Sequence, residues 1–372
     1  MGGVNRTESG AGGVNLGALR SHNTALVLDL LRTAGPDGIS RLELAERTGL
    51  TPQAVSKITA RLREDGLAAE AGRRASTGGK PRTVLRLVPD AGHAVGVHLD
   101  RDELTVVLCD LTGAVVARRA APLDLGADAD SVVDRLVAEV NGLVSGAARP
   151  GPVLGVGVAL PGPLDHRRGV LHCVTGFPEW NGFPLRSVLL RRLSLPVVVD
   201  KDTNAAALAL AVGPPETAGT SFAYLHFGAG LGGGLVIGGT VHRGTRTGAG
   251  EFGHQVVQLD GPPCGCGNRG CVEALCLAAV ARGDTAEAAR VLGTAAGNLV
   301  ALLDVDLVLL GGRTVAAAPD TFVDGVTAVL DARAARAGEE AIPVRLAPTA
   351  ADAVAEGAAQ LLLAPLFGRA EG

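Results

Sequence analysis

The sequence predicts an α/β protein that combines a small N-terminal unit of helices and a β-hairpin with a larger, internally duplicated α/β region. Three observations support this prediction. Apolar residues follow a helical period in the first part of the chain and then give way to two short strand-like runs. The pattern strand, turn, strand, turn, strand begins at "AVGVHLD" and begins again at "SFAYLHFG". A chain of 372 residues is also long enough for two or three domains, each with its own core.

Helix start and stop signals follow one another closely in the N-terminal part. After an apolar helix in "NTALVLDLLRTAG", Ser40 and Glu43 have the spacing of a capping box, and Gly49 ends the helix that they start. Thr51 followed by Pro52 starts the next helix at once. Because a helix, a tight glycine turn and a second helix form the helix-turn-helix plan, we expect DNA binding here.

The second helix of this pair and the hairpin after it supply the predicted DNA contacts. Val55, Ile58 and Leu62 recur at the spacing of a buried helical face. The hairpin joins "LAAEAG" to "TVLRLV" through a basic tip, which suits a wing on phosphates or in the minor groove; a solvated tip is the alternative. The predicted DNA-binding residues are Gln53, Ser56, Lys57 and Arg61 on the helix and Arg73, Arg74, Lys80 and Arg82 on the wing.

Charge is uneven along the chain. Residues 1–89 hold 13 Lys/Arg and 8 Asp/Glu, a net charge of +5, and the remaining 283 residues hold 21 minus 30, or −9, which sums to −4. A basic first quarter favours a polyanionic partner. We therefore expect a winged helix-turn-helix domain over residues 21–89, preceded by a disordered, glycine-rich arm over residues 1–20.

Membrane and disulfide signals are missing from the sequence. No apolar run reaches the roughly 18 residues of a membrane helix, and the N-terminus lacks the apolar core of a secretory signal. We expect a cytoplasmic protein without membrane contact. Three of the six cysteines lie outside the cluster described next, and this odd number argues against a disulfide framework.

One His and three Cys lie within 18 residues on a glycine-rich stretch: His254, Cys264, Cys266 and Cys271. An imidazole and three thiolates complete a tetrahedral zinc site and leave no position for a substrate. Because three thiolates and Zn²⁺ sum to −1, a poor centre for activating water, we expect one structural zinc per chain; four residues without a metal are the alternative. Glu251 and Glu273 flank the ligands, so zinc would hold two carboxylates that can accept hydrogen bonds from sugar hydroxyls.

The first hairpin turns of the two halves differ in chemistry. Gly228–Gly234 contains five glycines in seven residues and could let backbone N–H groups approach a phosphate. Asp100–Glu103 has no glycine and carries three carboxylates, which would repel a triphosphate. The sequence therefore does not favour a kinase, although Gly-rich turns in both halves would have done so.

Several motifs resemble the ROK family of bacterial sugar kinases and repressors over residues 90–366: "AGEFGH", "CGCGNRGCVE", "ALPGPLD", "WNGFPL" and "LVLLGG". The winged helix ahead of them resembles the repressor branch. The resemblance implies an actin-like (ribonuclease H-like) domain over residues 90–372, with lobe one about 90–212 plus 349–366 and lobe two about 213–348. It also implies the zinc site and a homodimer or homotetramer.

The resemblance further implies a sugar pocket. Matched residue by residue, the ligand-binding set is Lys201, Asp202, Glu251, His254 and Glu273, with His254 serving both zinc and sugar. Asp202 stands where the kinases have their catalytic base. Because a base without an ATP site transfers no phosphoryl group, we expect a vestigial base and no enzyme activity. Lys201 replaces the family's sugar-binding Asn, and this cation suggests an acidic or phosphorylated ligand.

The function expected from the sequence is a sugar-responsive DNA-binding transcription regulator, a repressor of carbohydrate metabolism or transport genes that binds a palindromic operator. One alternative is an ATP-dependent sugar kinase with an accessory DNA-binding domain, which the glycine-free turn Asp100–Glu103 disfavours. Another is a regulator that senses a partner protein and no sugar.

Overall fold

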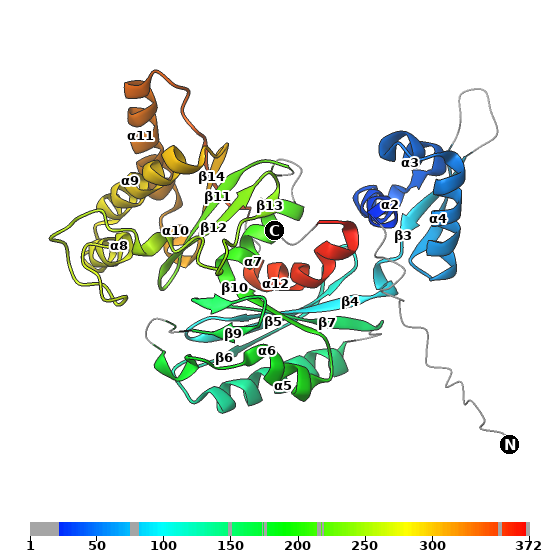
Figure 1. Cartoon of the computed structure of the whole chain (residues 1–372), viewed down its shortest axis with the longest axis horizontal. Coiled ribbons are helices and arrows are strands. Elements are labelled where there is room, and N and C mark those ends of the chain that lie inside the picture. The colour runs from blue at the N-terminus through cyan, green and yellow to red at the C-terminus, as the bar shows by residue number, and fades with distance from the viewer. Residues whose placement is uncertain are drawn as a thin grey trace.

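A computed structural model describes residues 22–74, 82–147, 151–172, 174, 177–213, 217, 219–348 and 352–369, with only the backbone of Arg73 and Arg74. It contains three compact parts, which we call the head (residues 22–88), lobe one and lobe two (Figure 1). The arm expected over residues 1–20 lies outside the described residues. No helix within the described ranges is long and apolar enough to span a membrane.

The head is the winged helix-turn-helix unit that the sequence predicts. Its elements are α2 (His22–Thr33), η1 (Gly35–Asp37), β1 (Ile39–Ser40), α3 (Arg41–Thr48), α4 (Pro52–Glu64), β2 (Ala68–Arg74) and β3 (Arg82–Leu87). The predicted capping box is present, because Ser40 Oγ accepts from Glu43 N while Glu43 accepts from Ser40 N. Gly49 ends α3 in the left-handed conformation, and the Thr51 side chain caps α4. Strands β2 and β3 pair antiparallel, and β1 adds to β3.

Lobe one contains a five-stranded sheet in the order β10-β7-β4-β5-β6. Its elements are η2 (Pro89–Ala91), β4 (His93–Leu99), β5 (Glu103–Asp110), β6 (Val115–Pro122), α5 (Ala129–Gly146), β7 (Val153–Leu160), β8 (Leu164–Asp165), β9 (Val170–Leu171), η3 (Pro178–Trp180), α6 (Leu185–Leu193), β10 (Val197–Lys201) and α7 (Asp202–Val212). The predicted meander is β4, β5 and β6, two antiparallel pairs, whereas β7 pairs parallel with β4 and β10 parallel with β7.

Lobe two repeats this topology, with a sheet in the order β15-β14-β11-β12-β13. Its elements are β11 (Phe222–Phe227), β12 (Leu231–Ile237), β13 (Thr240–Val241), η5 (Phe252–His254), α8 (Val272–Ala281), α9 (Thr285–Leu303), β14 (Leu307–Gly311), α10 (Arg313–Ala317), α11 (Pro319–Ala337) and β15 (Val344–Leu346); α12 (Ala353–Leu363) and η6 (Ala364–Phe367) follow. The pairings β11–β12 and β12–β13 are antiparallel, and β11–β14 and β14–β15 are parallel. The duplication seen in the sequence is therefore real.

Helices α7 and α12 lie between the two sheets (Figure 1). In β7, the residues Val156, Val158 and Leu160 point to a core shared with α5 and α6, while the alternate positions are Gly or Ala. This alternation lets the backbone of α12 lie directly on the sheet, since a Cβ at Gly157 would stand 1.8 Å from Ala358 O. The run "GVGVA" therefore has one large face and one flat face.

The head shares its core with lobe one and with the C-terminal segment. Leu28 and Leu31 of α2 belong to the same buried cluster as Cys109 of β5 and Phe367 of η6. The Arg32 guanidinium lies 5.2 Å from the Phe367 ring centroid. The head is therefore packed onto the end of α12 and is not merely tethered by a linker.

The close approach of α12 to β7 predicts that Gly157→Ala will destabilise the protein. A methyl group there must push α12 off the sheet, and overpacking of this kind costs about 1–3 kcal/mol. Gly146→Ala is the matched control, because a Cβ at Gly146 meets nothing within 4 Å. Urea unfolding of both variants checks this; equal stability of Gly157→Ala and the wild type would contradict the packing described.

Candidate functional site

A pocket of about 100 Å³ lies between the lobes, at the C-terminal ends of β4, β10 and β11. All five residues predicted to bind the ligand line it: Lys201, Asp202, Glu251, His254 and Glu273. They come from β10, the start of α7, the residues around η5 and the start of α8. The fold thus brings together residues that are up to 72 positions apart in the chain (273 minus 201).

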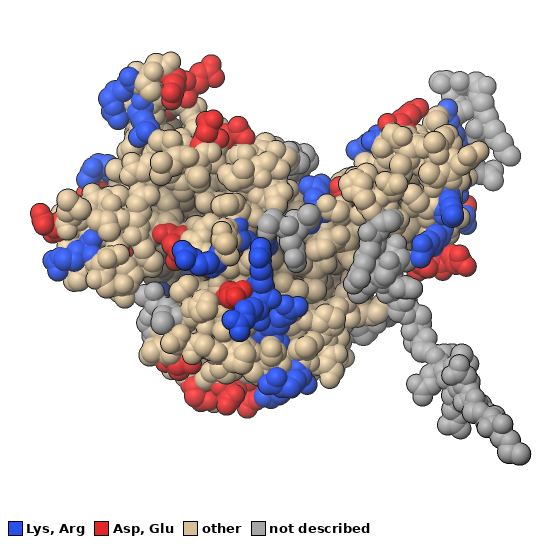
Figure 2. All heavy atoms as spheres, in the orientation of Figure 1, with Lys and Arg blue, Asp and Glu red and all other residues tan. Residues whose placement is uncertain are grey.

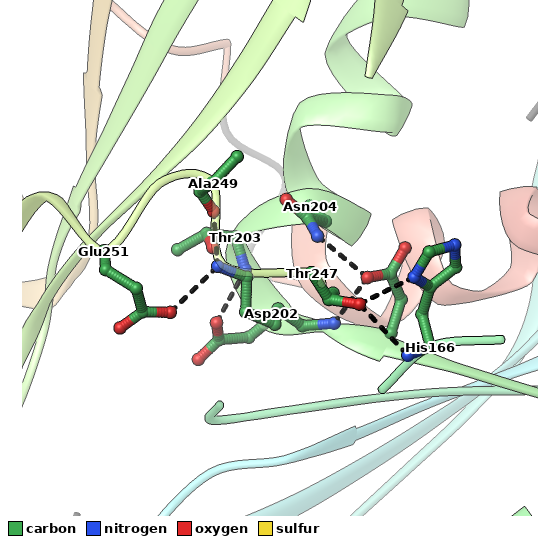
Figure 3. Close-up of polar contacts among 9 residues, drawn as sticks. His166, Asp202, Thr203, Asn204, Thr247, Ala249 and Glu251 are labelled. Atoms are coloured by element: carbon green, nitrogen blue, oxygen red, sulfur yellow. Dashed lines mark hydrogen bonds and ion pairs between the residues drawn. The ribbon is translucent and has the colours of Figure 1, made fainter. Parts of the chain in front are cut away.

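Lys201 is buried and paired inside this pocket, and Figure 3 labels its two partners, Ala249 and Glu251. Its Nζ donates to Ala249 O at 2.5 Å and to Glu251 Oε1 at 3.0 Å. Its side chain is 3% exposed, against 40% for Glu251, and its aliphatic stem packs on Gly162. The expected free cation is therefore compensated by Glu251. The cation no longer argues for an acidic or phosphorylated ligand.

The other carboxylates of the pocket are held by backbone N–H groups. Asp202 is the first residue of α7, where the helix dipole favours a negative charge, and its Oδ1 accepts from Thr203 N at 2.6 Å. Glu273 Oε2 accepts from Leu231 N at 2.8 Å, and Asp100 Oδ1 accepts from Arg101 N at 2.7 Å. These groups are oriented acceptors, which is the chemistry that hydroxyl donors of a sugar require.

His226, near the end of β11, lines the pocket from lobe two, and Tyr224 lies next to it on the same strand. Burial lowers the pKa of His226, although Asp202 and Asp100 nearby act in the opposite direction. Burial also raises the pKa of Tyr224, whose Oη lies 2.9 Å from His226 Nδ1. The imidazole is therefore neutral near pH 7 and can donate or accept one hydrogen bond.

Next to the pocket lies the cluster His254, Cys264, Cys266 and Cys271. Its four donor atoms lie within 4.8 Å of one another; Cys264 Sγ is 3.6 Å from His254 Nδ1, and Cys266 Sγ is 3.7 Å from Cys271 Sγ. A tetrahedral ion with S ligands at about 2.3 Å separates its donors by about 3.8 Å. The donor set and spacing fit a metal ion, and His254 connects the cluster to the pocket because it also lines the pocket.

Comparison with known proteins identifies both parts of the chain. Residues 94–282, about half of the chain, match the model of the ROK family. The chain belongs to the ROK family. Residues 35–68, within the head, match the model described as winged helix-turn-helix DNA-binding. The sequence resemblance to ROK proteins is thereby confirmed.

Individual ROK relatives are transcription regulators by name. The chain is 30% identical to the xylose repressor of Caldicellulosiruptor bescii over 236 residues, 63% of this chain and 59% of that protein. It is 31% identical over 263 residues to the DNA-binding transcriptional dual regulator NagC of Escherichia coli, covering 70% and 64% of the two chains. The chain thus spans about three fifths of the length of the xylose repressors that it matches.

Solved ROK structures share the fold. A ROK family transcriptional regulator, described as a homologue of the E. coli MLC protein, has a TM-score of 0.75 and 23% identity, covering 93% of this chain and 96% of that one. A ROK family glucokinase from Streptomyces griseus, in complex with glucose and AMPPNP, has a TM-score of 0.62 and 26% identity, covering 73% and 99%. The ROK fold therefore occurs in both a regulator and a kinase. The fold alone does not distinguish these two functions, so the residues of the site must be compared.

The structure describes some of the residues that the sequence predicts to contact DNA. Gln53, Ser56, Lys57 and Arg61 are all exposed on α4, and Arg82 is exposed at the start of β3. In Figure 2 the outer edge of the head, where Figure 1 places α4, carries basic side chains. Only the backbone of Arg73 and Arg74 is described, and Lys80 lies outside the described residues.

Sequence analysis missed some residues of the pocket. Asp100, Arg101 and His226 line it, but the turn holding the first two had been considered only as a poor phosphate loop. Their positions at the ends of β4 and β11, the equivalent strands of the two halves, were the available signal. Arg101 lies 5.6 Å from the Phe177 ring centroid and reaches toward Gly230 of lobe two.

The glycine-rich stretch Gly228–Gly234 serves packing in the structure. Its last three glycines lie inside β12, where a Cβ at Gly234 would stand 2.3 Å from Thr203 O of α7. Gly232 and Gly234 bring the start of α7, and with it Asp202, close to the sheet of lobe two, whereas Gly233 faces Phe252. Phosphate access is not needed to explain them.

The Lys201–Glu251 pair predicts a measurable coupling in stability. Glu251→Gln leaves the buried ammonium without its charged partner and should destabilise the protein more than the same change does when Lys201 is Met. Contacting residues in a shared network couple by about 0.5–3 kcal/mol, and the exposure of Glu251 places this pair near the lower end. A double-mutant cycle of Lys201→Met and Glu251→Gln by urea unfolding measures it, and additive effects would refute the pair.

Proposed function

We propose that this ROK protein is a sugar-responsive DNA-binding transcription regulator that represses genes of carbohydrate metabolism or transport. The observation that carries the proposal is the shared core of a winged helix-turn-helix head and a ROK lobe. The names of its relatives, a xylose repressor and NagC, agree with this role. A palindromic operator, a homodimer or homotetramer and a cytoplasmic location complete the proposal.

The ligand of the proposed regulator is a sugar bound in the interlobe pocket. Asp202, Glu251 and Glu273 offer carboxylate acceptors to hydroxyl groups, and His254 adds an imidazole edge. Since Glu251 compensates the charge of Lys201, three carboxylates and Arg101 remain to face the ligand. This balance favours an uncharged sugar over an acidic or phosphorylated one, because an anion would meet a net negative field.

A path of direct contacts connects the pocket to the head. Asp202 begins α7, and α7 packs against α12 so closely that a Cβ at Gly357 would stand 1.9 Å from Ala205 O. Helix α12 continues into η6, whose Phe367 packs against the head, and Arg369 pairs with Asp29 of α2 at 3.1 Å. A ligand that shifts the start of α7 can therefore act on the head through two packed helices.

Sugar kinase activity is the competing function, and the nucleotide side of the cleft disfavours it. The turn between β4 and β5 carries Asp100, Asp102 and Glu103, which would repel ATP phosphates. Arg313 at the start of α10 reaches across to Asp102, with Nη1 3.1 Å from Oδ2. Both side chains are more than half exposed, so the pair marks the proximity of the lobes more than it adds stability. We propose that Asp202 is a vestigial base.

The metal proposed for the His/Cys cluster is one structural zinc per chain. Zinc would fix the backbone around η5 and the start of α8, and thereby the directions of Glu251 and Glu273. A closed set of four protein donors leaves no position for a substrate, so the ion would shape the pocket and take no part in chemistry.

Sugar and operator should bind with reciprocal coupling. A coupling free energy of about 1–3 kcal/mol changes operator affinity by about 5–150-fold, and operator must change sugar affinity by the same factor. Calorimetry of the full chain with a sugar panel, with and without operator, measures both. Glu251→Ala should abolish sugar binding, and Gln53→Ala should alter operator preference while sugar binding remains.

The outcome that overturns sugar sensing is a sugar that binds with one affinity whether or not operator is present. Operator binding that survives removal of residues 1–89 would instead refute the head as the DNA-binding domain. Turnover of ATP with any sugar of the panel, followed by ADP release, would support the kinase.

Removal of the metal should reduce the order of the loops around the pocket and weaken sugar binding. Elemental analysis of the pure protein should find zinc near one per chain, and Cys266→Ser should lower both zinc content and sugar affinity because zinc binding and loop order are linked. Cys276→Ser, at a buried cysteine outside the cluster, is the control for general destabilisation. A fully folded, metal-free protein that binds sugar and operator normally would exclude this role for zinc.

A further inference from the structure

A second cavity, of about 370 Å³, lies where β10, α7 and β13 meet the C-terminal segment Leu361–Arg369. None of its described lining residues belongs to the sugar pocket. Its volume falls in the range of about 300–1,000 Å³ that small-molecule sites occupy. Nothing in the proposed sensing of sugar uses this cavity.

One part of the wall of the second cavity is aliphatic, and two guanidinium groups, those of Arg243 and Arg369, also line the cavity. The aliphatic lining residues are Val198, Val199, Leu208, Val212, Val241 and Leu361. Arg243 is only 5% exposed and lines the same space. Such walls can accept an unbranched hydrocarbon group and gain from its removal from water.

One hydrogen bond orients the Arg243 side chain and leaves other N–H donors of its guanidinium group unused. Its Nε donates to Asp200 Oδ2 at 2.6 Å. Among the described residues, the Arg243 side chain makes no other hydrogen bond. Asp200 Oδ1 is already used by Asn204 Nδ2 and by Lys201 N, so Asp200 is fixed in turn. The two Nη groups therefore remain as a pre-oriented fork, the geometry that binds a carboxylate through two parallel hydrogen bonds.

The charge balance around the second cavity is positive. Asp200 compensates Arg243, whereas Asp29 is shared by two arginines, Arg369 and Arg32. The lining itself contains two guanidinium groups, of Arg243 and Arg369, and one carboxylate, of Asp200, which leaves one positive charge; Asp29 and Arg32 lie outside the lining. His166, whose Nδ1 lies 2.7 Å from Thr247 Oγ1 (Figure 3), also lines the cavity. A ligand with a single negative charge fits this balance.

We propose that the second cavity is an effector site for a small amphipathic carboxylic acid, with its carboxylate on the Nη groups of Arg243 and its aliphatic chain against Leu208, Val212 and Leu361. One wall consists of Ala364–Arg369, the segment that holds the head. The opposite wall includes Asp200, which directly precedes the pocket residues Lys201 and Asp202. An acid bound here touches both the path to the DNA-binding head and the base of the sugar pocket.

The test compares butyrate, hexanoate and octanoate with butanol, hexanol and octanol by calorimetry on the full-length protein without sugar or operator. Each buried methylene should tighten binding about fourfold until the chain fills the cavity. The acids should bind at least tenfold more tightly than the matching alcohols, because only a carboxylate accepts the Arg243 fork. Equal binding of acids and alcohols, or no binding of any acid, would overturn the proposal.

Two variants locate the site. Val212→Phe fills the cavity and should abolish hexanoate binding while sugar affinity stays unchanged. Arg243→Lys keeps a cation beside Asp200 but loses the fork, and should weaken hexanoate binding at least tenfold; Arg290→Lys, at an exposed position of α9, should not. Hexanoate binding that survives in both cavity variants would place the acid elsewhere and refute the site. If a cavity variant fails to fold, the other variant and the alcohol series still decide.

Discussion

The contact on which the rest of the structure depends is the backbone packing of α12 against β4, β7 and α7. Glycine or alanine stands at each point of approach, so carbonyl oxygens of one element lie where side chains would otherwise begin. Gly96, Gly157 and Gly357 mark three of these points, toward Ala355 O, Ala358 O and Ala205 O respectively. Because no flexible side chain separates these backbones, a shift of one element must move its neighbour. This packing joins the interlobe pocket, at the start of α7, to the head, at the end of α12.

We propose that the electrostatics of the interlobe pocket, and not the fold, separate this chain from a kinase. The same fold holds glucose and AMPPNP in the S. griseus glucokinase, so the architecture alone is neutral between the two roles. In this chain the turn at Asp100–Glu103 is acidic, and Lys201 crosses to Ala249 and Glu251. The lysine ties the end of β10 to the stretch that carries Glu251, a contact made by the protein itself. Its buried charge is tolerable because a carboxylate and a carbonyl oxygen accept from the same ammonium.

The head and the ROK lobes share a buried apolar interface. They therefore differ from two domains that are connected only by a flexible linker. Leu28, Leu31 and Phe367 share one apolar cluster, and Asp29 accepts from arginines on both sides of the junction. An interface of this kind favours one orientation of the head. The second cavity lies beside it, bounded by the segment that carries Arg369. A ligand in either cavity can therefore affect the packing between the head and the C-terminal segment.

Local signals in the sequence determined the head and the duplicated sheets. Capping at Ser40 and Thr51 and the glycine stop at Gly49 are short-range patterns, and each predicted the element that the structure contains. The donor set of the metal cluster was equally plain, because its ligands lie close together in the chain. Only the tertiary structure decided that Lys201 is paired with Glu251, that two glycines of the second hairpin pack against α7, and that Arg243 lines a separate cavity. These facts depend on contacts between residues far apart in sequence, whose distances and charges become defined when the two lobes and α12 pack together.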